Sequence, residues 1–176
     1  NSSSAVIGVK SGGVRHALLT GDIDSVALRR LIENHTRCEA KILVFPHHGG
    51  VPKGKAYEFA RDLTAMVRPD VVVFSIGRGR FETPQPEIVQ GIVAAAPRVH
   101  IACTQLSTRC APAVPENAPM HLLLEPSSGV VSNSCCAGSV QLDLSNGTYL
   151  PGRDNHQAFV TLNAPLALCR QRPVVV

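Results

Sequence analysis

The chain lacks several features that would assign it to a broad class at once. No apolar run approaches the roughly eighteen residues that a membrane-spanning helix requires. No dense cluster of Lys and Arg occurs, so the net charge of +4 permits an anionic substrate without indicating nucleic-acid binding. With 17% charged and 44% hydrophobic residues, the composition excludes a disordered chain. The 176 residues fit one domain with a small appendage.

The first residues also lack the layout of a signal peptide. Asn1-Ser2-Ser3-Ser4 is polar, and no Met begins the chain. We therefore expect a cytoplasmic protein without a membrane span in this chain, and we expect the natural chain to begin upstream of Asn1.

Strand and helix patterns alternate over the first two-thirds of the chain. The segments Ala5–Val9 and His16–Thr20 flank Ser11-Gly12-Gly13, which predicts two strands joined by a tight turn. Further strands are predicted at Lys41–Phe45, Val71–Ile76 and Val99–Cys103, and helices at Ser25–His35, Tyr57–Val67 and Pro86–Ala96. This order predicts helices packed on a sheet, an α/β fold.

The composition changes after Cys110. Ala111–Pro119 contains three prolines and no periodicity, which predicts a loop. Short strand-like segments separated by Gly, Asn and Pro follow at Leu122–Leu124, Val140–Leu144 and Ala158–Leu162. We therefore divide the chain into an α/β domain over residues 1–105 and a small Cys-rich β extension over residues 106–176.

Two polar clusters follow predicted strands directly. Leu18–Thr20 ends in Gly21-Asp22, where a carboxylate can project into a site at the sheet edge; alternatively, Asp22 or Asp24 caps the next helix. Pro46-His47-His48-Gly49-Gly50 follows the next strand, and imidazoles in such a turn suit zinc or manganese, although a surface loop can also contain two histidines. Because parallel strands joined by a helix end at the same edge, Asp22 and His48 are expected to converge and to form half of a hydrolytic metal site.

With these clusters in place, the chain resembles the second half of the ComEC-type branch of the metallo-β-lactamase superfamily. The resemblance rests on the Asn1–Ser4 start, Leu18–Asp22, Phe45–Gly50, the Ser75-Ile76-Gly77 strand end, and Pro84-Gln85-Pro86-Glu87, and it extends from Asn1 to about Gln105. It implies half of an αββα sandwich that acts as a phosphodiesterase-like or nuclease-like hydrolase with two divalent metals.

The resemblance also implies roles for individual residues. Asp22 matches the metal-bridging carboxylate, and either His47 or His48 matches the late histidine ligand, with His48 favoured. Asn1 falls where many relatives have another metal-binding His and is expected to line the site. Zinc is the expected metal, with manganese as the alternative.

Two departures from the family pattern limit what this chain can do alone. The main ligand motif of the superfamily, His-x-His-x-Asp-His or His-x-Asp-x-Asp-His, is absent, and the other histidines are too scattered to rebuild it. Relatives often have Gly-His-Pro where this chain has Glu82-Thr83-Pro84, so Thr83 either contacts substrate or caps the next helix. We expect an upstream segment or another chain to supply the N-terminal half of the fold.

The extension contains a second group of possible ligands. Cysteine thiolates and an imidazole can form a structural zinc site, and the candidates are Cys103, Cys110, Cys135, Cys136, His156 and Cys169. We prefer Cys110, Cys136, His156 and Cys169, with Cys103 and Cys135 as substitutes. Disulfides or inert buried thiols are the alternatives, because the spacing is not the usual Cys-x-x-Cys.

Arg78 and Arg80 follow the strongest predicted strand and either hold a phosphoester or nucleic-acid phosphate, or belong to a solvated loop. Three hypotheses for function therefore stand: a metal-dependent hydrolase, a non-catalytic scaffold that retains the fold, and a zinc-stabilised interaction domain. A His-x-His or His-x-Asp motif upstream of Asn1 would favour the first.

Overall fold

A mixed five-stranded sheet with four helices forms the frame of the protein. The computed structural model describes residues 3–34, 36–52, 54–79, 81–116, 119–122, 127 and 129–170. The sheet has the order β1 (Ile7–Ser11), β2 (Val14–Leu19), β3 (Ile42–Val44), β4 (Val71–Phe74) and β5 (His100–Cys103). β1 and β2 form an antiparallel hairpin, and β2 to β5 run parallel. The predicted α/β arrangement over this part of the chain is confirmed.

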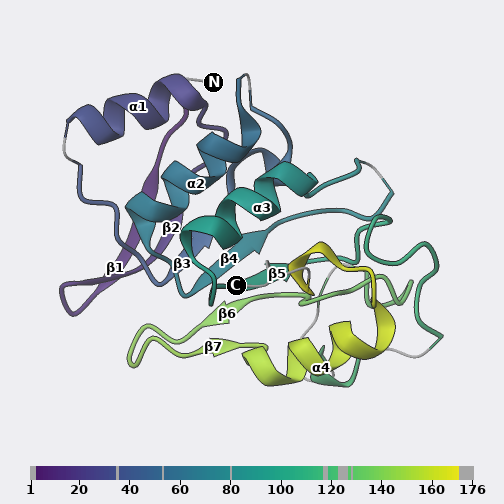
Figure 1. Ribbon diagram of the computed structural model, residues 1–176. Coiled ribbons are helices and arrows are strands. Elements are labelled where there is room, and N and C mark those ends of the chain that lie inside the picture. Colours follow the sequence, from purple (N-terminus) through teal and green to yellow (C-terminus); the bar gives the residue numbers. More distant parts are fainter. Residues whose placement is uncertain are drawn as a thin grey trace.

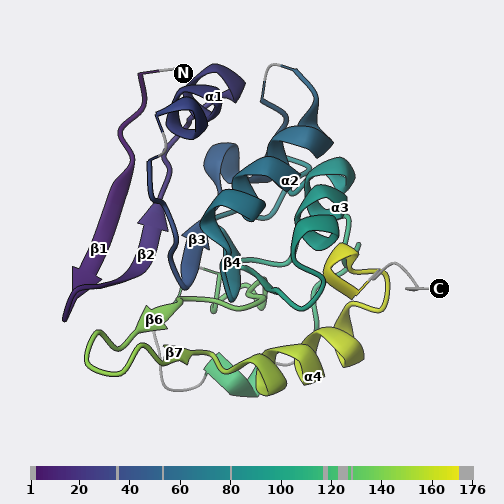
Figure 2. The same ribbon diagram turned by 60° about the vertical axis from the view of Figure 1, so that its left-hand side comes forward.

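Three helices connect the parallel strands and lie on one face of the sheet (Figure 1). They are α1 (Ser25–Glu33), α2 (Ala56–Val67) and α3 (Pro86–Ala95). Consecutive parallel strands joined by right-handed crossovers place all the connecting helices on the same face. Figure 2 shows the sheet with these helices on one side of it.

The helices form because their apolar residues recur on one face. In α2 the buried positions include Phe59, Leu63 and Val67, which are four residues apart and face the sheet. The helix ends at Arg68, which has a left-handed backbone, and Pro69 follows. α2 and α3 pack closely at Gly91, where a Cβ atom would meet the carbonyl oxygen of Tyr57.

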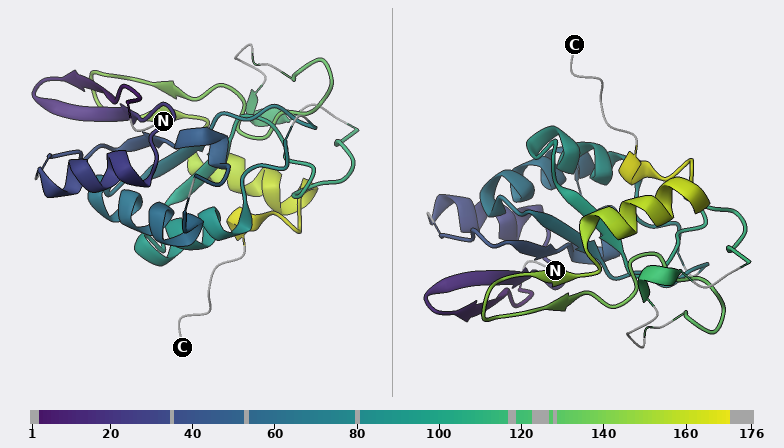
Figure 3. Two further views of the ribbon diagram at one scale, coloured as in Figure 1. Left: turned by 90° about the horizontal axis from the view of Figure 1, so that it is seen from above. Right: turned by 90° about the horizontal axis from the view of Figure 1, so that it is seen from below.

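The extension covers the opposite face and one edge of the sheet. Its hairpin of two-residue strands, β6 (Gln141–Leu142) and β7 (Tyr149–Leu150), lies across the face opposite the helices (Figure 3). The helix α4 (Arg153–Asn163) lies beside β5, and Phe159 and Val160 join the same hydrophobic cluster as Ile101. The boundary at residue 105 stays a prediction, since this cluster contains residues from both sides of it.

Two details of the extension differ from the sequence predictions. The predicted strand Ala158–Leu162 is wrong, because these residues belong to α4. Leu122 ends a 3-10 helix, η2 (Met120–Leu122), and the rest of Leu122–Leu124 lies outside the described residues. The extension is therefore mixed rather than β. Within the described part of the chain, no helix is long and apolar enough to cross a membrane.

Candidate metal site and cysteine cluster

The ends of β2, β3 and β4 bring three loops to one edge of the sheet. These strands run parallel, so the residues that follow them emerge on the same side. The buried Thr20 links the loop after β2 to the end of β3, because its hydroxyl donates to the carbonyl oxygen of Val44 at 2.8 Å. Ile23, which is 1% exposed, anchors the loop in the core. Asp22 is held between these two fixed points.

Asp22 and His47 lie side by side at this edge. Nδ1 of His47 is 3.8 Å from Oδ1 of Asp22, and the two side chains are 22% and 56% exposed, respectively. The other ring nitrogen of His47, Nε2, lies 3.1 Å from the carbonyl oxygen of Ile23. That carbonyl can only accept, so Nε2 carries a proton, and Nδ1 is the ring nitrogen that faces the carboxylate.

His48 is turned away from this pair. Its Nδ1 donates to the carbonyl oxygen of Ser75 at 2.5 Å, at the end of the neighbouring strand β4. We favoured His48 as the ligand beside Asp22; the contact that the structure contains is made by His47 instead. Sequence patterns do not separate two adjacent histidines, because the backbone conformation of the turn decides which ring faces which loop.

The backbone of this turn is left-handed over three consecutive residues. The φ values are 52° at His47, 55° at His48 and 80° at Gly49. Non-glycine residues in this region cost about 1–3 kcal/mol each, and such residues cluster at functional sites. Gly49 is required by its surroundings, because a Cβ atom there would lie 2.7 Å from Cβ of Pro84 and 2.8 Å from the ring of Phe74.

The donor set fits a divalent ion in two respects. Metal-binding histidines usually donate their other ring N–H to a carbonyl or carboxylate, as His47 does to Ile23 and His48 does to Ser75. Ligand atoms that share one zinc ion each lie about 2.0–2.2 Å from it, so a separation of 3.8 Å allows a shared ion. Among the residues that the structure describes, however, no three His, Cys, Asp or Glu side chains are arranged to hold a metal.

The other candidates at this edge have different surroundings. Arg78 donates from Nη1 to the carbonyl oxygen of Leu106 and from Nη2 to those of Ala111 and Pro112, at 2.8–2.9 Å. This side chain therefore clamps the loop after β5 instead of extending toward a phosphate. Asn1 and Arg80 lie outside the described residues.

Thr83 does not cap the helix that follows it. The N-cap of α3 is Gln85, which makes no side-chain capping hydrogen bond, and Thr83 is buried two residues earlier. It lies close to Gly50, in the turn that contains the histidines. The expected capping role is therefore wrong, whereas a contact with substrate stays a prediction.

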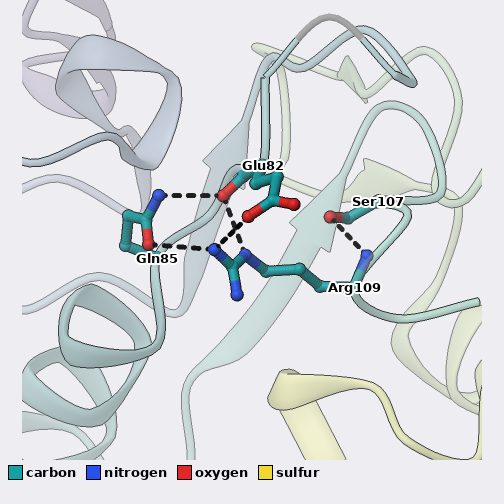
Figure 4. Close-up of polar contacts among 4 residues, drawn as sticks. All are labelled: Glu82, Gln85, Ser107 and Arg109. Carbon is teal, nitrogen blue, oxygen red and sulfur yellow. Dashed lines mark hydrogen bonds and ion pairs between the residues drawn. The ribbon is translucent and has the colours of Figure 1, made fainter.

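An ion pair that the sequence did not indicate joins two loops near this edge (Figure 4). Nη2 of Arg109 lies 2.6 Å from Oε2 of Glu82, and Nε of the same arginine donates to the Glu82 carbonyl oxygen at 3.0 Å. Nη2 also reaches Oε1 of Gln85 at 3.4 Å. The backbone N–H of Arg109 donates to Ser107. The partners are far apart in sequence, so no local pattern could have revealed them.

Four of the candidate cysteines line one small cavity behind β5. Its volume is about 10 Å³, and its lining includes Cys103, Cys110, Cys136 and Cys169 with apolar neighbours such as Val160. Cys135 does not line this cavity, and its Sγ lies 3.0 Å from the Ser127 hydroxyl. The described cysteines form no disulfide.

Three histidines gather beside this cavity. Nε2 of His156 lies 3.2 Å from Sγ of Cys136, and Nδ1 of His156 lies 2.8 Å from Nε2 of His100. This series of hydrogen bonds continues from Nδ1 of His100 to the Tyr149 hydroxyl at 3.2 Å. The ring of His121 contacts that of His156. Burial, together with His100 and His121, lowers the pKa of His156 to about 3, so its ring is neutral. His100 and His121 lie far from His156 in the sequence, and only the fold brings the three together.

Comparisons with known proteins add no relative to these observations. No protein-family model, curated protein or solved structure matches the chain. The resemblance to the metallo-β-lactamase superfamily therefore depends on the motifs quoted above, and its consequences for function are proposals.

Proposed function

We propose that the protein is part of a metal-dependent hydrolase of the metallo-β-lactamase type, acting on phosphodiesters in the manner of a nuclease. Asp22 and His47 supply two of the ligands of its metal centre. The observation that carries the proposal is their 3.8 Å contact at the ends of two adjacent parallel strands. The strained turn that presents His47 supports it.

Two arrangements explain the orientation of this pair, a bound cation and an ion pair. His47 has a proton on Nε2, and when Nδ1 carries no second proton, two acceptors face each other. A cation between them removes this repulsion. A second proton on the ring would instead produce an ion pair, and the experiment below distinguishes the two arrangements.

Two donors are too few for a hydrolytic centre. Catalytic zinc sites usually have three protein ligands and one open position. The proposal therefore includes the partner that the resemblance implies, an N-terminal half of the fold that supplies the remaining ligands. His48 is a further candidate, because its hydrogen bond to Ser75 leaves Nε2 for a ligand or substrate.

A divalent ion bound here would polarise a phosphoryl oxygen and lower the pKa of a bound water toward neutrality. The contribution of this chain is to hold the ligands in place. Ile23 fixes the ring of His47 through its carbonyl oxygen, and Thr20 fixes the end of the strand that precedes Asp22. The exposure of Asp22 leaves the site open to solvent and to a substrate.

Manganese is the appropriate probe, because it suits carboxylate ligands and does not favour the soft thiolates of the cysteines. In a titration followed by amide NMR, Mn²⁺ should broaden the signals of residues 21–23 and 47–49 first. Asp22→Asn and His47→Gln should abolish this selectivity. Asp24→Asn is the matched control, since Asp24 caps α1 in the same loop and should leave the broadening unchanged.

Broadening that survives both site substitutions would refute the metal site and leave the ion pair as the explanation of the contact. The chain alone should hydrolyse bis(p-nitrophenyl) phosphate with Mn²⁺ only weakly, because ligands are missing. Robust turnover that Asp22→Asn abolishes would instead mean that this chain already contains a complete site. Full-length protein that binds the metal without any hydrolysis would favour the scaffold hypothesis.

A further inference from the structure

Four cysteines from four separate segments line one small cavity of the molecule. Cys103 ends β5, Cys110 lies in the loop after it, Cys136 lies in the loop before β6, and Cys169 lies in the 3-10 helix η3 (Leu168–Arg170). All four line the cavity of about 10 Å³, which has roughly the volume that one water molecule or ion occupies. The remaining lining is apolar except for Ser107.

We propose that Cys103, Cys110, Cys136 and Cys169 bind one soft divalent ion of the zinc type, and that His156 orients Cys136 without binding the metal itself. This ligand set differs from the one we preferred on sequence alone. Cys103 replaces His156, since the four thiols share the cavity while the imidazole stands behind one of them. Cys135 is excluded by its contact with Ser127.

Metal binding would change the protonation of the thiols. Burial raises the pKa of Cys103 and of Cys136 well above that of a free thiol, and the neighbouring cysteines raise both further. A divalent ion would displace the thiol protons, because a coordinated thiol is deprotonated. Each S–H bond is replaced by a sulfur–metal bond, and four protons leave to solvent for each ion bound.

The hydrogen-bond chain behind Cys136 suits both states. With a thiol, Cys136 donates to His156, His156 donates to His100, and His100 donates to Tyr149. With a metal-bound thiolate the direction reverses, so that Tyr149 donates to His100, His100 to His156, and His156 to the sulfur. All distances in the chain lie between 2.8 and 3.2 Å, and every ring stays neutral in either direction. A donor to a metal-bound sulfur is the usual outer-shell arrangement around such sites.

The cluster must close around the ion to bind it. No three of the described side chains are yet arranged for a metal. Cys169 is the half-buried member of the four and lies in the short η3 helix. We expect metal binding to order η3 against β5.

Cobalt is the probe for this site, added to the reduced full chain without other metals. Thiolate coordination should give near-ultraviolet charge-transfer absorption and the visible bands of tetrahedral Co²⁺, saturating at one ion per chain. Zinc should displace the cobalt. Titration calorimetry in two buffers of different ionisation enthalpy should count close to four protons released per zinc; three would make His156 a ligand in place of one thiol and overturn the assignment.

The variants separate the cluster from the rest of the chain. Cys110→Ser and Cys169→Ser should each weaken binding by at least about tenfold, and His156→Gln by about 10- to 100-fold with the charge-transfer band retained. Cys135→Ser and Cys38→Ser are matched controls and should leave binding unchanged. The double variant Asp22→Asn, His47→Gln should keep the full cobalt spectrum, which makes this test independent of the hydrolase proposal.

The wild-type spectrum and proton count decide the question if a variant does not fold. No thiolate absorption, or a disulfide between two of the four cysteines in the native protein, would overturn it.

Discussion

Nδ1 of His47 faces Oδ1 of Asp22 across 3.8 Å, although the two residues belong to different loops and the adjacent His48 faces elsewhere. The left-handed turn after β3 creates this asymmetry between two neighbouring histidines. We therefore expect His47→Ala to weaken Mn²⁺ binding by about tenfold or more, the lower end of the losses seen when ligand surroundings are disturbed. His48→Ala should have a smaller effect. Equal losses, measured by relaxation of the water signal, would mean that both rings bind the ion.

The turn itself should be intolerant of a side chain at Gly49. Gly49 and Gly79 have similar φ values of 80° and 76°, but a Cβ atom meets Pro84 and Phe74 at Gly49 and nothing within 4 Å at Gly79. Both alanine variants therefore have similar backbone strain. The difference between their free energies of unfolding measures the cost of the steric overlap with Pro84 and Phe74. We expect Gly49→Ala to reduce the free energy of unfolding by about 1–3 kcal/mol more than Gly79→Ala does. Urea denaturation measures both, and equal losses would mean that Phe74 and Pro84 move aside at no cost.

The loop after β5 depends on Arg78 more than on Arg109. Arg78 donates to three carbonyl oxygens, and hydrogen bonds from charged groups to fixed acceptors contribute about 1.5–3 kcal/mol in favourable cases. Arg109 pairs with Glu82, whose side chain is 71% exposed, and such pairs contribute only about 0–1 kcal/mol. We expect Arg78→Lys to destabilise the protein by about 1–3 kcal/mol and Arg109→Lys by less than about 1 kcal/mol. Hydrogen exchange of residues 106–111 should increase in the first variant; protection that stays unchanged would contradict the clamp.

The sequence predicted the parts of the fold that local patterns encode. The β-branched run Val71–Val73 and the four-residue spacing in α2 each determine one element, and the parallel order then brings Asp22 near the His47-His48 turn. Contacts that depend on the conformation of a turn, or that join segments distant in the sequence, could not be predicted from local patterns. The choice between His47 and His48, the carbonyl contacts of Arg78 and the approach of His100 to His156 belong to this group. Ala158–Leu162 was mispredicted because its apolar residues fit a strand as well as one face of α4.

Asp24 resolves the alternative roles of the two aspartates after β2. Its side chain accepts hydrogen bonds from the backbone N–H groups of Val26 and Ala27 at 3.1 Å, and these bonds define the N-cap of α1. The bond from Ala27 is the main cause that lowers the pKa of Asp24 in the folded protein. Asp22 is therefore not the residue that caps this helix.

The lowered pKa of Asp24 in the folded state determines how the stability of the fold depends on pH. The folded protein binds this proton less readily than the unfolded chain, so the ionised cap stabilises the fold above the ordinary carboxyl pKa. This contribution is lost as the pH falls through the lowered value. Asp24→Asn keeps an acceptor for the two N–H groups but cannot ionise, so it should flatten the dependence of the melting temperature on pH in the acidic range. Asp24→Ala should lower the melting temperature at neutral pH, while Asp22→Ala at the same pH should not. Two results would contradict the capping role of Asp24. One is a loss of melting temperature for Asp22→Ala as large as that for Asp24→Ala. The other is an unchanged fall of the melting temperature at acidic pH in Asp24→Asn.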